Sequence, residues 1–97
     1  MKLFILTCVA LCAQGGELSK LEGPSVCTTA YPTIGKARKQ MRLELQQELQ
    51  EAEKQKRLPE DYKAKSTNRD AEFVIGKPGD GSCWNQVTWE ITEIIIP

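Results

Sequence analysis

The segment that most constrains this chain is residues 36–57, which read KARKQMRLELQQELQEAEKQKR. It contains no glycine, no proline and no β-branched residue, and nearly all of its residues are strong helix formers. The sequence therefore predicts one long helix over residues 36–57, with Thr33 as a candidate N-terminal cap. The helix is expected to end before Leu58-Pro59, because a residue that precedes proline disfavours helical geometry.

The apolar side chains of this helix form one narrow stripe, at Met41, Leu45, Leu49 and Ala52. A stripe of this width buries only one edge of a helix, so the helix is expected to lie on the surface of another element. The helix also contains four glutamates in this region: Glu44, Glu48, Glu51 and Glu53. On a solvated helix such residues are predicted to be ordinary surface charges and not a catalytic carboxylate pair.

The element on which the helix packs is predicted near the C-terminus. The last apolar segment alternates with a period of two and places on one face Val87, Trp89 and Ile91. This period is typical of a half-buried antiparallel strand. Residues 71–75 form a second strand and residues 76–81 a glycine-rich turn, so residues 71–96 are predicted to be a β-hairpin.

Together these elements predict an α+β fold class: a small single domain in which one long amphipathic helix lies against a short antiparallel sheet. Residues 25–31 add a short strand, which gives the order β-α-β-β. Residues 16–24 are polar, contain glycine and proline, and are predicted to be a loose arm.

The first residues have the layout of a secretory signal peptide. Lys2 is followed by about ten apolar residues and then by small residues, a run shorter than the roughly 20 that span a bilayer. Ala13-Gln14-Gly15 fits a signal peptidase site. We therefore predict a leader at residues 1–15 and a secreted, extracellular domain at residues 16–97.

Loss of this leader leaves Cys27 and Cys83 as the only cysteines. An oxidising compartment favours a disulfide between them. The bond would close a loop of about 57 residues, worth roughly 4 kcal/mol in the chain-entropy model. The sequence therefore predicts one disulfide that holds the last strand to the N-terminal segment.

The composition excludes several kinds of function. The chain has no histidine, and two thiols alone make a poor metal site, since zinc needs about four ligands. A catalytic thiol or serine would lack its usual base. Removal of Lys2 with the leader leaves a net charge of about minus one, which indicates neither nucleic acid nor an anionic membrane as partner. We predict no enzyme activity, no cofactor and no metal.

Binding of an extracellular protein is the predicted function. Trp84 lies at the start of the last strand, and an exposed tryptophan is a favoured anchor for a protein partner. The predicted partner-binding residues are Trp84, Gly79, Asp80 and Phe73.

A precursor of a signalling peptide is a second hypothesis. Lys54-Gln55-Lys56-Arg57 matches the basic tetrad that secretory-pathway convertases cleave. The tetrad lies at a predicted helix end, where fraying exposes the backbone. Cleavage after Arg57 would release the chain from Leu58 onward, with Lys54, Lys56 and Arg57 as the recognition residues.

A third hypothesis comes from residues Glu72-Phe73-Val74-Ile75-Gly76. This segment resembles the Gln-x-Val-x-Gly loop of cystatins: Val74 and Gly76 match, and Glu72 replaces the glutamine. The resemblance covers five residues and the general order of elements, and the usual pair of C-terminal disulfides is missing. It implies a secreted inhibitor of cysteine proteases in which a helix lies across an antiparallel sheet.

Overall fold

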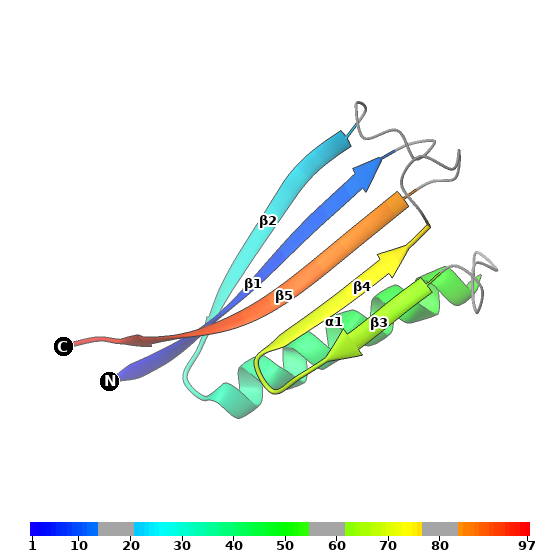
Figure 1. The fold of residues 1–97 in the computed structure, drawn as a ribbon. Helices are drawn as coiled ribbons and strands as arrows, with labels where there is room; N and C mark the ends of the chain where they lie inside the picture. Colours follow the sequence, from blue (N-terminus) through cyan, green and yellow to red (C-terminus); the bar gives the residue numbers. More distant parts are fainter. Residues whose placement is uncertain (14–20, 55–61, 77–83) are drawn as a thin grey trace.

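The computed structural model describes residues 1–13, 21–54, 62–76 and 84–97. Within them, a five-stranded antiparallel sheet lies against one helix (Figure 1). In chain order the elements are β1 (Lys2–Ala13), β2 (Leu21–Tyr31), α1 (Ile34–Lys54), β3 (Tyr62–Ser66), β4 (Asp70–Ile75) and β5 (Trp84–Ile95). The strand order is β2-β1-β5-β4-β3, so the first and last strands are neighbours in the middle of the sheet. The two termini meet there, and the Met1 amino group donates to the Ile96 carbonyl at 3.1 Å.

Helix α1 begins two residues before the predicted segment, and residues 55–57 lie outside the described residues. The Thr33 hydroxyl accepts a hydrogen bond from the Lys36 amide at 3.3 Å, which confirms the predicted cap. The buried residues of the helix are Ala37, Met41, Leu45 and Ala52. Met41, Leu45 and Ala52 of the predicted stripe are therefore confirmed as buried, and Leu49 is partly buried against the core. Leu43, which lies beside the stripe, is exposed.

The core lies between α1 and one face of the sheet. That face consists of buried residues from three strands: Leu6 of β1, Ala71, Phe73 and Ile75 of β4, and Val87, Trp89 and Ile91 of β5. None of these side chains is more than 7% exposed. The alternation in β4 and β5 has the period of two that puts every second side chain on the same face. The predicted packing of the helix stripe on the face of the last strand is confirmed.

The turn between β3 and β4 connects the start of the helix to the sheet. The Thr67 hydroxyl donates to the Asp70 carboxylate at 2.7 Å and accepts from the Asp70 amide at 3.1 Å. The Arg38 guanidinium donates from Nε to the Asn68 carbonyl at 3.0 Å. The Thr67–Asp70 bonds close the turn, and the Arg38 bond joins the N-terminal half of α1 to it.

The predicted order β-α-β-β with a short sheet is wrong, because the described residues form two strands before the helix and three after it. Residues 21–24 belong to β2 and not to a loose arm. Strand β3 lies between the predicted helix and the predicted β-hairpin, where the sequence predicted no strand. It is an edge strand whose Lys63 and Lys65 face solvent, and lysines on an edge oppose further strand pairing but leave little hydrophobic signal.

The predicted disulfide between Cys27 and Cys83 is also wrong. Cys27 is exposed and its thiol is free, whereas Cys83 lies outside the described residues. Cys27 pairs with Cys8 of β1, while Trp84, the described residue next to Cys83 in the chain, pairs with Ala13. At about 3.3 Å per residue along a strand, and with β1 between β2 and β5, the start of β5 at Trp84 does not lie opposite Cys27.

The described part of the segment predicted to be a signal peptide forms strand β1, which lies inside the sheet between β2 and β5 (Figure 1). Lys2–Ala13 pairs with β2 on one side and with β5 on the other. Removal of residues 1–15 by a signal peptidase remains a prediction, and it would take β1 out of this sheet. Among the described residues, no helix has the length and hydropathy needed to cross a bilayer.

Candidate functional site

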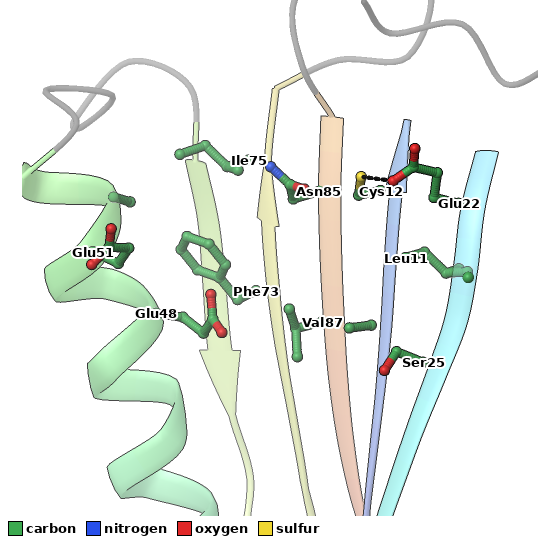
Figure 2. A pocket seen from close by; sticks show the side chains of 13 residues that line it. Leu11, Cys12, Glu22, Ser25, Glu48, Glu51, Phe73, Ile75, Asn85 and Val87 are labelled. Carbon is green, nitrogen blue, oxygen red and sulfur yellow. Dashed lines mark hydrogen bonds between the residues drawn. The ribbon is translucent and has the colours of Figure 1, made fainter. Parts of the chain in front are cut away.

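An opening with both apolar and charged walls lies between the C-terminal half of α1 and the sheet (Figure 2). Because α1 follows β3 and β4, it leaves part of the helix-facing side of β1 and β2 uncovered (Figure 1). The cavity has a volume of about 430 Å³. We call it the acidic groove, and its lining residues are Ala10, Leu11, Cys12, Glu22, Gly23, Ser25, Glu48, Glu51, Ala52, Phe73, Ile75, Asn85 and Val87.

The floor of the acidic groove is apolar. Phe73 and Ile75 reach it from β4, Val87 from β5 and Ala52 from α1. These four side chains also belong to the core, so the floor is held in place by the packing of the whole domain. A rigid apolar floor with a few polar groups above it is the usual form of a binding site.

The rim of the acidic groove is negatively charged. Glu48 and Glu51 extend from α1 on one side, and Glu22 extends from β2 on the other (Figure 2). The Cys12 thiol donates to Glu22 Oε2 at 3.8 Å. None of the described residues that line the groove is lysine or arginine. The rim therefore favours a ligand with positive charge.

Glycine at position 23 brings β2 close to β1 beside the groove. The register of the two strands shifts between Ala10 and Cys12, which is a β-bulge. Gly23 has φ of 105°, and a Cβ atom there would lie 2.9 Å from the Ala10 carbonyl oxygen. Only glycine accepts both the positive φ and the close approach, and the neighbouring Glu22 is thereby placed on the rim.

The partly buried position of Glu48 in the acidic groove disfavours the charged form of its carboxyl. Burial, followed by repulsion from Glu51, raises the pKa of the Glu48 carboxyl above its ordinary value. When the pKa of a carboxyl is higher in the folded than in the unfolded state, its protonated form stabilises the fold. This stabilisation is complete below the unfolded-state pKa and is lost as the pH rises through the folded-state pKa. The charged form of Glu48 is therefore the destabilising one, and its population grows as the pH rises.

We expect Glu48→Gln to be more stable than the wild type at about pH 7, and the difference to shrink as the pH falls to about 4. Urea midpoints at the two pH values measure this. Glu53→Gln, an exposed position on the same helix outside the groove, is the matched control and should show no such difference. A stabilisation of equal size at both pH values would show that the charge of Glu48 is not the cause of the difference in stability.

The structure brings only some of the predicted partner-binding residues to the groove. Phe73 forms part of the floor and is 2% exposed, so it is first of all a core residue. Trp84 is half-buried at the start of β5 and does not line the groove. Gly79 and Asp80 lie outside the described residues.

The residues of the other two hypotheses lie elsewhere. Lys54 is the exposed last residue of α1, and Lys56 and Arg57 lie outside the described residues. Residues 72–75, which resemble the cystatin loop, lie inside β4 and pair with β3 on one side and β5 on the other. A strand paired on both sides does not present a loop to a protease cleft, so the inhibitor hypothesis receives no support from this placement.

Sequence reasoning missed the charged residues of the rim. Glu48 lies three residues after Leu45 and four before Ala52, a spacing that places it on the apolar face of the helix. This spacing is the feature of the sequence that could have identified Glu48 as a site residue, because a glutamate on the buried face of a helix is unusual. Glu22 gave no comparable signal, since its place depends on the bulge in β2.

Comparisons with known proteins assign the chain to no family. No family model matches it, and neither the curated proteins nor the solved structures give a significant match. Within the described residues, no group of three or more histidine, cysteine, aspartate or glutamate side chains is arranged to hold a metal ion. The chemistry of the acidic groove is therefore the main guide to function.

Proposed function

We propose that this protein is a non-enzymatic binding protein whose acidic groove accepts a short basic segment of another protein. An apolar side chain of that segment would lie on the floor beside Phe73 and Val87. Lysine or arginine residues on either side of it would pair with the carboxylates of the rim. The observation that supports this proposal is the combination of an apolar floor with three carboxylates, in a lining whose described residues include neither lysine nor arginine.

The chemistry of the groove favours binding over catalysis. A reactive thiolate normally lies beside cationic groups or a histidine base. The Cys12 thiol instead lies beside the Glu22 carboxylate, and the other ionisable side chains among the described lining residues are Glu48 and Glu51. This arrangement suits recognition of a cation better than activation of a nucleophile.

A peptide-binding experiment tests the proposal. The probe is a fluorescein-labelled peptide in which one leucine is flanked by two lysines and two arginines, and anisotropy measures its binding to the full chain. We expect binding that weakens steeply as salt is raised, because both partners are charged. A peptide with glutamates in place of the basic residues should not bind.

Charge reversal in the protein identifies the site. Glu48→Lys is expected to weaken binding of the basic peptide by about tenfold or more, since tenfold corresponds to only ~1.4 kcal/mol. Glu53→Lys makes the same change in total charge on the same helix outside the groove and is expected to have a small effect. Equal losses in the two variants would mean that net charge, and not the acidic groove, attracts the peptide.

Export and the nature of the partner remain predictions from the sequence. The N-terminal pattern predicts secretion, and secretion would make the partner an extracellular protein. The binding proposal concerns the chain that keeps β1, because Ala10, Leu11 and Cys12 of β1 line the groove. The precursor hypothesis is separate, and fragments cut after Arg57 in secreted material would support it.

A further inference from the structure

Two cysteines lie directly opposite each other in the first pair of strands. Cys8 of β1 and Cys27 of β2 are partners in the antiparallel register. Residues that face each other in this way have Cα atoms about 4.5–5.5 Å apart and side chains on the same face of the sheet. A disulfide needs a Cα separation of about 4.4–6.8 Å, so the backbone already has a suitable spacing. Both thiols are free in the structure.

The two thiols differ in their surroundings. Cys27 is exposed on the outermost strand, whereas Cys8 is half-buried and packs against the core. On its other side, Cys8 faces Trp89 of β5, which does not titrate. Burial, followed by the charges of Glu44, Cys27 and Glu48, raises the pKa of the Cys8 thiol to about 11. Cys27 is thus the accessible thiol, and Cys8 is the one that reacts after it.

We propose that Cys8 and Cys27 are an oxidisable pair that forms a cross-strand disulfide with a low-molecular-weight disulfide, such as oxidised glutathione, as the oxidant. The Cys27 thiolate attacks one sulfur of the oxidant, a mixed disulfide forms, and one small thiolate leaves and takes up a proton. Cys8 then loses its proton to solvent and attacks the Cys27 sulfur, which expels the second small thiol. The two protein thiols lose two electrons and two protons in total, and the small disulfide is reduced to two thiols.

The register selects this pair among the described cysteines. Cys12, by contrast, is opposite Glu22 on β2 and opposite Asn85 on β5. The proposed bond would join β1 to β2, and it forms only in a chain that retains residues 1–13. It is independent of the peptide-binding proposal, because Cys8 and Cys27 do not line the acidic groove.

The test uses full-length protein in which Cys12 and Cys83 are replaced by serine, so that only Cys8 and Cys27 remain. After incubation of the folded protein with oxidised glutathione, we expect a mass lower by two hydrogen atoms. Non-reduced peptide mapping should show a link between the two strands. In a matched variant that contains only Cys27, the reaction is expected to stop at a stable glutathione adduct. Circular dichroism before oxidation confirms that both variants are folded.

The rate of ring closure provides a second measurement. Because the Cys8 thiol must lose its proton before it attacks, the mixed disulfide should close about tenfold faster for each pH unit, up to the pKa of Cys8. The charged groups that face Cys8 are Glu44 and Glu48 of α1, besides Cys27 of β2. Glu44→Gln is therefore expected to accelerate closure at a fixed pH, whereas the exposed Glu53→Gln is not.

Two results would overturn the proposal. One is a two-cysteine protein that keeps both thiols, or only the glutathione adduct, after long incubation at alkaline pH while it remains folded. The other is a link from Cys27 to Cys83 in oxidised full-length wild-type chain, since the register places Cys8 and not the start of β5 opposite Cys27.

Discussion

A chain that begins at Gly16 is expected to lose the cooperative fold. Strand β1 lies between β2 and β5 and supplies backbone hydrogen bonds to both. It also supplies Leu6 to the core, where this side chain is 3% exposed. Without β1, two long strands would become unpaired edges. We expect this loss to exceed the about 5–15 kcal/mol by which small domains are stable.

The measurement compares the full chain with the chain from Gly16 by circular dichroism and urea unfolding. We expect a sigmoidal transition for the full chain and none for the shorter one. A synthetic peptide of residues 1–15, added to the shorter chain, serves as the control, because it can restore the missing strand without a covalent link. If the shorter chain alone unfolds cooperatively at the midpoint of the full chain, β1 is dispensable and the predicted leader can be removed without loss of the fold.

This result bears directly on the predicted secretion. Cleavage of a leader at residues 1–15 and insertion of β1 into the sheet are alternative fates of the same residues. The intact mass of material exported from a secretory host distinguishes the two, since it shows whether the product begins at Met1 or at Gly16. An exported product from Gly16 that is folded would require a sheet different from the one described here.

The elements that sequence reasoning predicted well are those whose spacing matches their burial. The stripe of Met41, Leu45 and Ala52 has the period of a helix, and the alternation through Val87 and Trp89 has the period of a strand. In both cases the side chains that repeat with the correct period are the ones the structure buries.

The N-terminal strand could not be recognised by the same means. A continuous apolar run such as Lys2–Ala13 is typical both of a leader and of a strand with neighbours on both sides. Strand β3 was missed for the opposite reason: among its residues only Ala64 packs against the core, so no pattern marks it. The pairing of Cys27 with Cys8 depends on the register, which spacing along the chain does not reveal.

The acidic groove was only partly predictable. Phe73 was expected at a binding surface, and it does line the groove, but from its buried floor. Glu22, Glu48 and Glu51 come from two elements that lie on opposite sides of the opening. Side chains from separate elements meet at one opening only because of the order of the strands in the sheet. That strand order was the part of the fold that the sequence prediction got wrong.

Phe73→Ala is expected to destabilise the protein by about 3–5 kcal/mol. The ring is 2% exposed and packs in the core with residues of α1 and β5, so its removal leaves a cavity that the surrounding strands cannot fill. A loss of this size is a large share of the total stability of a small domain. Urea unfolding at neutral pH measures the change.

Val74→Ala is the matched control, because Val74 is the next residue of the same strand and lies on the opposite face, half-buried. We expect this variant to lose less than about 1 kcal/mol. Peptide binding, measured where both variants are folded, separates the two roles of Phe73. An unchanged urea midpoint for Phe73→Ala together with lost peptide binding would show that the ring is a surface contact and not part of the core.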